Sequence, residues 1–286
     1  LEEIDNGNIV IIAGFQGVTS NMDTTTLGRG GSDTTAVAMA VALKAERCEI
    51  YTDVAGVFTA DPRVVPDARK LADLSFEEML ELASYGAGVL HPRAVELGAV
   101  YQIPILVASS FSNEMGTLIH GGDPMETRNR LSGIAYDMDI AKITIMGIPD
   151  RPGIAASIFE PLAQAGISVD TIVQNASEGN ITDLTFTVTR EDLTEAQTIV
   201  GSIGAKLGSR GVATDSELGK VSIIGNGMQN APGYAARMFS ALYQAGINIQ
   251  LITTSEIRIT CIVVSTQVKM AVKVLHDAFY IEEMEI

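Results

Sequence analysis

Apolar runs and helix-forming stretches alternate through residues 1–133. The run at residues 9–13 is entirely apolar and predicts a fully buried strand. Residues 36–43 are rich in helix formers and contain neither Gly nor Pro, so they predict a helix. Further strands are expected at residues 49–52, 103–107 and 117–119. This alternation is typical of a layered α/β sheet.

A glycine-rich segment, residues 14–35, connects the first predicted strand to the first predicted helix. Ser32 or Asp33 is placed to cap the helix, and free backbone N–H groups at such a junction bind anions. Arg29 adds a guanidinium suited to carboxylate or phosphate. Three glycines would admit a phosphate close to the backbone: Gly28, Gly30 and Gly31. The spacing matches neither the nucleotide P-loop nor the dinucleotide fingerprint, so a plain strand–helix turn stays an alternative.

The second half of the chain contains an internal repeat. Residues 142–147 recur as residues 220–225, and further identities at a similar offset indicate a duplicated domain. Each copy is expected to run strand, helix, strand, strand, helix, strand, which is a ferredoxin-like βαββαβ unit. The helices of the two copies should present apolar faces made by Ile154, Ile158, Phe159 and Leu162, and by Val268, Val272, Leu275 and Phe279.

Several local signals divide the chain. Ser75 followed by Glu78 is a capping box that predicts a helix to about Tyr85. His91 precedes a proline at a predicted helix start and is expected to have a hydrogen-bonded structural role. Residues 120–132 contain two glycines, a proline and mixed charges, which predicts a connector with a boundary near residue 132. The predicted domains are residues 1–132, 133–215 and 216–286.

The composition narrows the possible partners. A formal net charge of −16 argues against nucleic acid or an anionic membrane as a partner, since both select basic surfaces. No apolar run approaches the roughly 20 residues needed to span a bilayer. Cys48 and Cys261 lie far apart, with no Cys or His near them at metal-ligand spacing. We expect both to be reduced and partly buried in a cytoplasmic protein, and we predict no metal site made by the protein alone.

Three blocks, residues 14–17, 27–33 and 51–63, resemble the aspartate kinases of the amino-acid kinase family. The duplicated units resemble the paired ACT regulatory domains of those enzymes. The resemblance implies an α/β fold in which the nucleotide-side half of a kinase α/β/α sandwich precedes two ferredoxin-like ACT domains. The implied reaction is ATP-dependent phosphorylation of the β-carboxylate of L-aspartate, with Mg²⁺ bridging the phosphates.

The resemblance also implies which residues meet ATP. Thr52 and Asp53 fall at the end of a strand, where open α/β sheets bind ligands. Phe58 stands where the family usually has Tyr, and Gly88 where many members have Lys. Arg63 would reach the phosphates, although an Asp-Pro-Arg turn alone is an ordinary surface feature. The implied set is Tyr51, Thr52, Asp53, Phe58, Asp61, Arg63 and Gly88.

For catalysis the resemblance implies a role for the glycine-rich loop. Arg29 would clamp a substrate carboxylate, and the backbone N–H groups of Gly30 and Gly31 would hold the transferring oxygens. The implied substrate-binding set is Arg29, Gly30, Gly31 and Ser32. Asp33 would orient the family's phosphate-binding lysine. That lysine belongs to a Lys-Phe-Gly-Gly-Thr-Ser block, which this sequence does not contain. We therefore expect the chain to be a fragment or processed product without kinase activity of its own.

The ACT resemblance implies lysine and threonine as effectors, with control by lysine alone as an alternative to control by both, and a homo-oligomer formed through the ACT domains. Acidic side chains in these domains suit the amino group of an effector. The implied contacts in the first copy are Asp150, Pro152, Gly153, Ile154, Ala155, Ser168, Val169, Asp170 and Gln174. In the second copy they are Tyr234, Ala235, Asn248, Ile249, Ser255 and Glu256. An ordinary structural role is the alternative for any one of them.

Two other functions remain open at this level. The first is a non-catalytic regulatory subunit that senses amino acids through its ACT domains. Such a subunit would have no need of residues 27–33 beside residues 52–53, which favours the enzyme. The second is another amino-acid kinase, acting on glutamate or a nucleotide, but that function leaves the duplicated units unexplained.

Overall fold

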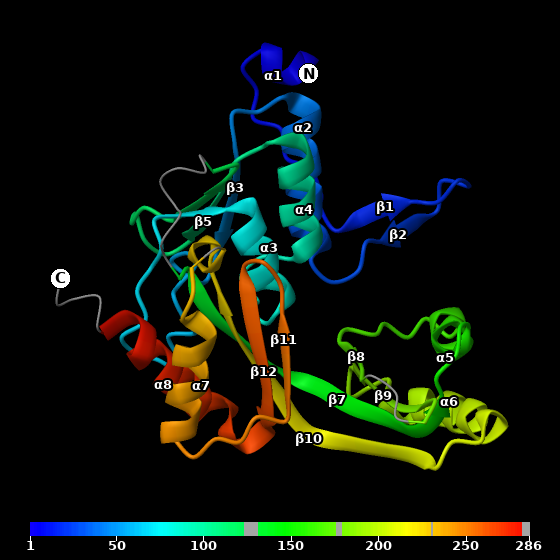
Figure 1. Cartoon of the computed structure of the whole chain (residues 1–286). Helices are drawn as coiled ribbons and strands as arrows, with labels where there is room; N and C mark the ends of the chain where they lie inside the picture. Colours follow the sequence, from blue (N-terminus) through cyan, green and yellow to red (C-terminus); the bar gives the residue numbers. More distant parts are fainter. Residues whose placement is uncertain (123–130, 176–178, 230, 282–286) are drawn as a thin grey trace.

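The computed structural model describes residues 1–122, 131–175, 179–229 and 231–281 (Figure 1). An N-terminal part, residues 1–122, lies at one end of the molecule. Two units, each of four strands and two helices, lie at the other end and share one six-stranded sheet. The chain therefore has the mixed α/β character that its sequence predicts.

The N-terminal part is built on a four-stranded sheet in the order β3-β5-β6-β4. Its strands are β3 (Cys48–Thr52), β5 (Ile105–Ser109), β6 (Thr117–His120) and β4 (Asp73–Ser75). Three helices pack in its core: α2 (Gly31–Leu43), α3 (Phe76–Ser84) and α4 (Pro92–Tyr101). Their side chains Val37, Met79 and Val95 are buried in one core with the apolar side of the sheet. The strands predicted after residue 48 form at or near their expected positions.

Two helices of this part begin as their sequences predict. The Ser75 hydroxyl accepts the Glu78 N–H at 3.2 Å, and the Glu78 carboxylate accepts the Ser75 N–H at 3.1 Å, which completes the capping box. At the start of α4, Pro92 occupies the first turn and His91 Nδ1 accepts the Arg93 N–H at 3.3 Å. The structural role predicted for His91 is confirmed.

The strand predicted at residues 9–13 is wrong. Ile9 is 95% exposed and Ile11 is 93% exposed. Within the described ranges no strand pairs with this run, so its backbone has no ladder to join. The short helix α1 (Glu2–Asp5) precedes it, and β1 (Gln16–Val18) and β2 (Thr24–Thr26) form a hairpin that projects from the body (Figure 1). The sequence identifies an apolar run, but a β-strand also needs a neighbouring strand with which to pair.

The predicted cap of α2 is also wrong. The helix begins at Gly31, so Ser32 and Asp33 lie inside its first turn. The N-cap is Gly30, whose φ of 72° is left-handed, and no side chain caps this helix end. Glycine adopts this conformation at low cost, which lets the helix start earlier than a side-chain cap would allow.

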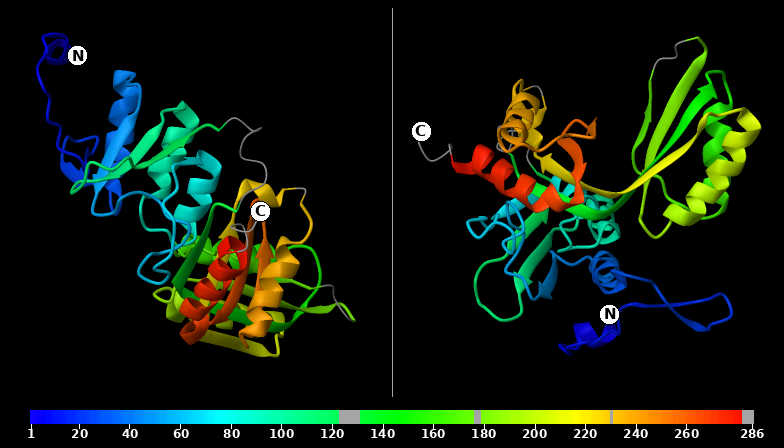
Figure 2. Two further views of the ribbon diagram at one scale, coloured as in Figure 1. Left: turned by 90° about the vertical axis from the view of Figure 1, so that its left-hand side faces the viewer. Right: turned by 90° about the horizontal axis from the view of Figure 1, so that it is seen from below.

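The six-stranded sheet has the order β11-β12-β10-β7-β9-β8. Its two central strands, β7 (Gly133–Pro149) and β10 (Gly211–Ile224), are long and antiparallel. The later residues of β7 pair with β9 (Ile181–Val188), whereas the later residues of β10 pair with β12 (Arg258–Val264). The edge strands are β8 (Ile172–Gln174) and β11 (Leu251–Thr254). Each long strand therefore serves both units, as the view from below shows (Figure 2).

This pairing differs from the predicted division into residues 133–215 and 216–286 at one segment. Residues 133–137 pair with residues 220–224 and supply the fourth strand of the second unit. We therefore define the first unit as residues 141–215 and the second unit as residues 133–137 with residues 218–281. The first unit is inserted into the second. The sequence repeat could not reveal this insertion. A repeat aligns segments of similar sequence, but it carries no information about which strands pair.

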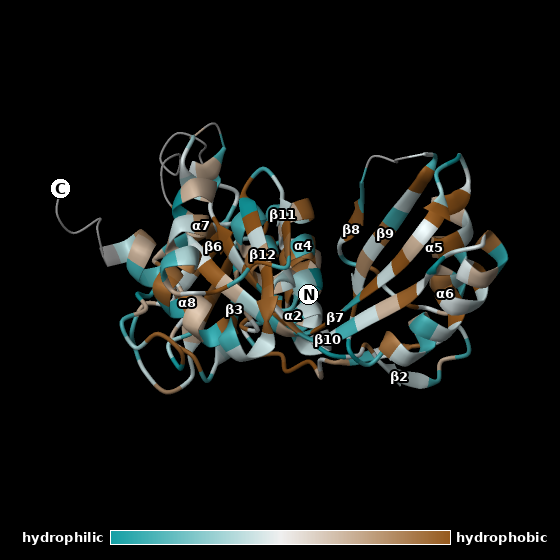
Figure 3. Ribbon diagram, turned by 60° about the horizontal axis from the view of Figure 1, so that its bottom comes forward, coloured by the Kyte–Doolittle hydropathy of each residue, from teal (hydrophilic) through white to brown (hydrophobic). Residues whose placement is uncertain are grey.

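Each unit packs two helices on its share of the sheet (Figure 3): α5 (Ile154–Gln164) and α6 (Leu193–Leu207) in the first, α7 (Tyr234–Gln244) and α8 (Val268–His276) in the second. The apolar residues predicted on α5 and α8 lie in these cores, as expected. The first unit has a core of its own. The core of the second unit also contains Ala60, Val64 and Val65 from the N-terminal part. The second unit and the N-terminal part are thus packed together as one body.

Most of the predicted connector, residues 120–132, lies outside the described residues, which leave a gap from 123 to 130. After the gap, Leu131 and Ser132 are buried. The Ser132 hydroxyl donates to the Glu78 carboxylate. The chain thus re-enters the body beside the start of α3 before it continues into β7.

Candidate functional site

A cavity of about 360 Å³ opens where the chain leaves β3 after Thr52. At the end of the strand, the Thr52 hydroxyl donates to Asp53 Oδ1 at 3.1 Å. Apolar side chains such as Leu82 share the lining with polar ones. Six of the seven predicted nucleotide residues line this cavity: Thr52, Asp53, Phe58, Asp61, Arg63 and Gly88.

The loop after β3 is held over this edge of the sheet by its own pairing and by one buried threonine. Phe58 forms an antiparallel bridge with Lys70. The hydroxyl of Thr117, which is fully buried, accepts the Val57 N–H at 2.9 Å and donates to the Leu71 carbonyl at 2.7 Å. The loop therefore folds back over this edge of the sheet, and it forms one wall of the cavity.

Asp61 and Arg63 form an ion pair at the cavity, with Arg63 Nη2 at 2.9 Å from Asp61 Oδ2. The Tyr136 hydroxyl donates to the same Oδ2 at 3.1 Å. Hydrogen bonds from Arg63, with a further one from Tyr136, hold the pKa of Asp61 below its ordinary value. The Arg63 side chain is 88% exposed, so its guanidinium stays accessible while Asp61 orients it.

One wall of the cavity was not predicted from the sequence: β7 contributes Ile134, Ala135 and Tyr136. These residues lie far along the chain from the other walls and belong to the strand of the second unit. The backbone of β7 also lies close to Gly86, where an added Cβ would come 1.8 Å from the Tyr136 carbonyl oxygen. No local signal identifies this wall, because its place depends on the pairing of β7 with β10.

The glycine-rich loop and Tyr51 do not line the cavity. Tyr51 is 60% exposed and its hydroxyl donates to Glu49 Oε2 at 2.9 Å. Arg29 is exposed, and Asp33 Oδ2 accepts the His91 N–H at 3.4 Å. An added Cβ at Gly30 would come 2.2 Å from the His91 side chain. The loop therefore lies against His91, whereas residues 86–89 just before it form part of the cavity.

The predicted effector residues of the first unit fall into two groups that make different contacts. Gln174 Nε2 donates to Asp150 Oδ1 at 3.3 Å, which joins β8 to the loop that precedes α5. That loop holds Pro152 and Gly153, followed in α5 by buried Ile154 and exposed Ala155. After α5, Ser168 is exposed and Val169 packs on the core of the unit. Asp170 instead pairs with Lys220 of β10, with its Oδ2 3.0 Å from Nζ.

In the second unit, the predicted effector residues make contacts with several different elements. Tyr234 stacks on Phe279 with ring centroids 6.0 Å apart, and Ala235 and Ile249 pack on the core. Asn248 is exposed. The Ser255 hydroxyl donates to Glu81 Oε1 at 3.3 Å, and Glu256 Oε2 accepts from Gln229 at 3.4 Å. The turn at residues 255–256 thus faces α3 of the N-terminal part.

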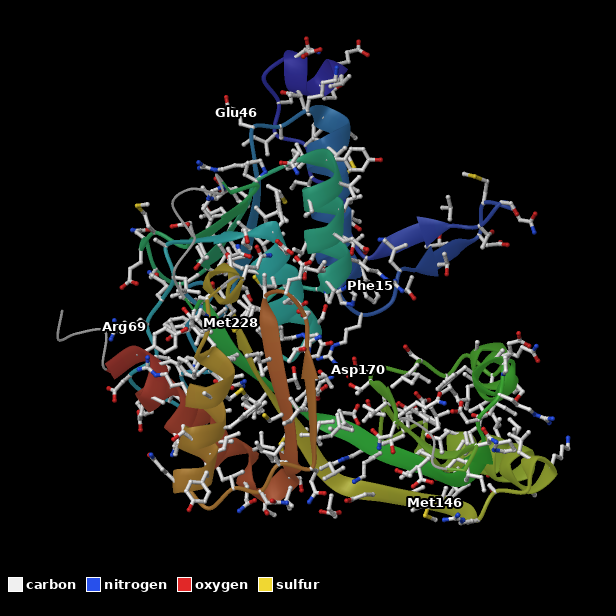
Figure 4. The ribbon with its side chains drawn as sticks, in the orientation of Figure 1. Phe15, Glu46, Arg69, Met146, Asp170 and Met228 are labelled. Carbon is white, nitrogen blue, oxygen red and sulfur yellow. The ribbon has the colours of Figure 1, made fainter. Side chains whose placement is uncertain are left out.

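A cluster of charged side chains around Tyr85 joins all three parts of the molecule. Lys220 Nζ lies 4.8 Å from the Tyr85 ring centroid, and the Arg258 guanidinium carbon lies 3.8 Å from it. Arg258 Nε donates to Glu81 Oε2 at 2.8 Å. The Tyr85 hydroxyl lies 3.4 Å from Asp170 Oδ1, and burial, followed by this carboxylate, raises the pKa of Tyr85 to about 12. Figure 4 shows Asp170 in the angle between the two units.

The described residues contain no candidate for a metal centre or a membrane-spanning helix. No three His, Cys, Asp or Glu side chains in that part of the chain are grouped to hold a metal ion. None of the helices described there is long and apolar enough to cross a bilayer.

Family models match both halves of the chain. The model of the amino acid kinase family matches residues 1–109. The model of the ACT domain matches twice, at residues 143–201 and 221–279. The second match begins in β10 and ends just after α8, so it coincides with the part of the second unit that is continuous in sequence.

Named relatives agree with these matches. The aspartokinase of Pseudomonas aeruginosa is 49% identical over 282 residues, covering 98% of this chain and 68% of the relative. The structure of E. coli aspartokinase III in complex with aspartate and ADP superposes with a TM-score of 0.82 at 32% identity, covering 96% of this chain and 61% of that one. The same enzyme in complex with lysine and aspartate gives a TM-score of 0.75 at 32% identity, with the same two coverages. With this fold, these ACT domains and nearly half of its residues identical to a curated aspartokinase, the chain belongs to the aspartate kinase family.

Proposed function

We propose that this chain carries the nucleotide-binding side and the regulatory domains of an enzyme that phosphorylates the β-carboxylate of L-aspartate with ATP. The observation that carries the proposal is the cavity at the end of β3, where six of the seven predicted nucleotide residues lie together. The complex of E. coli aspartokinase III with aspartate and ADP supports the choice of both ligands.

The residues of the cavity suit a nucleotide, because they offer surfaces for the nucleoside and one cation for a phosphate. Phe58 and Leu82 offer apolar surface for a base, and Asp53 offers a carboxylate for ribose hydroxyls. Arg63 is exposed and held by Asp61, so its remaining N–H groups are free to donate to a phosphate. ATP supplies the transferable phosphoryl group, and Mg²⁺ would be held chiefly by phosphate oxygens and water.

Aspartate would bind beyond His91, at the glycine-rich loop. Arg29 is exposed there and suits the substrate carboxylate as a bidentate donor. The N–H groups at the start of α2 suit an anion, because no side chain caps that helix. Phosphoryl transfer to a carboxylate needs no strong base, so these groups act by positioning and charge neutralisation.

We also propose that the chain alone has no kinase turnover. The loop that would bind the substrate does not line the nucleotide cavity, and Arg63 is already paired with Asp61. Little positive charge is then left to neutralise a triphosphate, in a chain whose formal net charge is −16. A phosphoryl-transfer assay on this chain should give no product above background, and normal turnover would contradict the proposal.

The regulatory ligands are proposed to be lysine and threonine, bound by the ACT domains of a homo-oligomer. The complex of E. coli aspartokinase III with lysine and aspartate supports lysine. In this chain Asp150 and Gln174 lie beside the start of α5, where an amino group would meet a carboxylate. The free, buried cysteines Cys48 and Cys261 agree with a reducing, cytoplasmic compartment.

Calorimetric titration of the chain with ATP tests the nucleotide site. We expect saturable binding that is weakened roughly tenfold by Arg63→Ala, which removes a charge-assisted phosphate contact. Arg47→Ala is the matched control, because Arg47 is exposed and pairs with Glu49 away from the cavity. Binding of lysine without any binding of ATP would favour the alternative, a regulatory subunit that only senses amino acids.

A further inference from the structure

We propose that Tyr136 is a positioning residue of the nucleotide site: its hydroxyl fixes Asp61, and Asp61 in turn holds Arg63 in place for a phosphate. The inference rests on the proposed nucleotide site and adds to it a residue from the strand of the regulatory sheet. Tyr136 lies outside every sequence block from which the nucleotide residues were predicted.

The contacts of Asp61 carry this inference. Arg63 approaches both carboxylate oxygens, with Nε at 3.0 Å from Oδ1 and Nη2 at 2.9 Å from Oδ2. Asp61 and Arg63 are only two residues apart, so this pair by itself is a local feature of an exposed turn. The Tyr136 hydroxyl, 3.1 Å from Oδ2, attaches the turn to a strand 75 positions away in sequence. The Asp61 side chain is only 16% exposed, in contrast to the 88% exposed Arg63.

Tyr136 itself is fixed from both sides. On β7 it pairs with Val221 of β10, toward the end of the long antiparallel ladder that lies in the second unit. Its carbonyl oxygen lies so close to Gly86 that no Cβ would fit there, and Gly86, Gly88 and Tyr136 line the same cavity. The Tyr136 hydroxyl on this paired strand therefore holds Asp61, and through Asp61 the exposed Arg63. Tyr136 does not itself touch the phosphate in this proposal: it holds Asp61, and Asp61 orients Arg63, which touches the phosphate.

A positioning role and a purely structural role of the Tyr136 hydroxyl predict different effects on ligand binding when the hydroxyl is lost. If the Tyr136 hydroxyl only stabilised the cavity wall, its loss would weaken every ligand of the cavity alike. If the hydroxyl positions Arg63, its loss weakens the binding of ligands that have phosphates and leaves the binding of the nucleoside unchanged. The ring stays in place in Tyr136→Phe, so apolar contacts with a base are retained.

The experiment titrates the 286-residue chain with ATP and with adenosine in a calorimeter. The variants are Tyr136→Phe, Arg63→Ala and the double variant. Tyr243→Phe serves as the matched control, because Tyr243 is 82% exposed on α7. We expect Tyr136→Phe to weaken ATP binding roughly three- to tenfold and to leave adenosine within twofold. In the Arg63→Ala background, Tyr136→Phe should have no further effect on ATP, because the two residues act through one contact.

Equal weakening of ATP and adenosine by Tyr136→Phe would overturn the positioning role, and so would independent, additive effects of the two substitutions. An unchanged ATP affinity in Tyr136→Phe, with Arg63→Ala still impaired, would also overturn it while leaving the proposed nucleotide site intact. An ATP affinity that does not respond to Arg63→Ala would instead refute the phosphate contact of the proposed function. Urea unfolding of each variant confirms that it is folded under the conditions of titration.

Discussion

Lys220 and Asp170 form an ion pair, with Nζ 3.0 Å from Oδ2, and thereby join the two regulatory units. The Lys220 side chain is 8% exposed, and its ammonium also lies 3.4 Å from Asp137 Oδ2 and over the ring of Tyr85. Tyr85 follows α3 of the N-terminal part, so one buried ammonium is in contact with all three parts. Asp170 is also a predicted effector residue, which means that an effector bound there would compete with this pair.

Replacing Lys220 by Met should destabilise the chain. The substitution keeps the length of the side chain but leaves two carboxylates without their buried partner. Loss of one member of a fully buried pair costs about 3–5 kcal/mol, and the carboxylates here are about a third exposed, so we expect roughly 1–3 kcal/mol. Urea unfolding at pH 7 measures this difference. Lys269→Met is the matched control, because Lys269 is exposed on α8, and an equal loss in both variants would show that the pair is not responsible.

Gly86 and Gly88 lie two residues apart beside the cavity at the end of β3, yet they should respond differently to alanine. At Gly86, φ is +119° and an added Cβ would come 1.8 Å from the Tyr136 carbonyl oxygen. Gly86→Ala therefore requires either the loop or β7 to move, and we expect a loss of roughly 2–4 kcal/mol in the free energy of unfolding.

Gly88→Ala is the matched control for that prediction. An added Cβ at Gly88 meets nothing within 4 Å, and its φ is outside the left-handed region. We expect its unfolding free energy to stay within about 0.5 kcal/mol of the wild type. Urea unfolding of both variants at the same pH measures the difference, and equal stabilities would argue against the close approach of β7 to this loop.

Local sequence signals predicted those parts of the molecule that depend on neighbours in sequence. The capping box of Ser75, the structural role of His91 at the start of α4 and the apolar faces of α5 and α8 all follow from signals within or beside one helix. The predicted nucleotide residues from Thr52 to Arg63 also lie within one short stretch of sequence, and they line the cavity together. Their identification came from the resemblance to a family, and their geometry follows from the loop folding back on itself.

The features that were missed depend on contacts between distant segments. The apolar run at residues 9–13 has no neighbouring strand, so its periodicity gave a wrong prediction. The fourth strand of the second unit precedes the first unit in sequence, and a repeat search cannot detect this exchange. Tyr136 comes to Asp61 only because β7 pairs with β10. A single sequence contains no pattern that records such a pairing.

His276 predicts a pH dependence of stability. It is 3% exposed, its Nε2 lies 3.0 Å from the Thr59 hydroxyl, and burial lowers its pKa below the ordinary value. In the unfolded chain the imidazole takes up a proton near pH 6.5, whereas the folded chain resists protonation until a lower pH. Stability is therefore retained above pH 6.5 and lost as the pH falls below it, by up to about 1.4 kcal/mol per pH unit from this group.

Urea unfolding at pH 7.5 and at pH 5.5 measures this effect. The wild type should lose roughly 1 kcal/mol more between the two conditions than His276→Gln, which cannot titrate. His120→Gln is the control and should retain the dependence of the wild type. The pKa of Asp61 is lowered, so that carboxylate affects stability only at still lower pH. An identical pH dependence in the wild type and in His276→Gln would contradict the assignment.

Gly88→Lys should tighten ATP binding by this chain. The resemblance to the family implies Lys at this position in many members, and here an added Cβ finds open space beside the cavity. Asp61 partly neutralises the charge of Arg63, so a second cation would interact with phosphates that otherwise meet little positive charge. We expect roughly two- to fivefold tighter binding of ATP, no change for adenosine, and a smaller gain at high salt. Gly88→Gln has a similar length without the charge. If it tightened ATP as much as Gly88→Lys, the gain would come from added contact area and not from the charge.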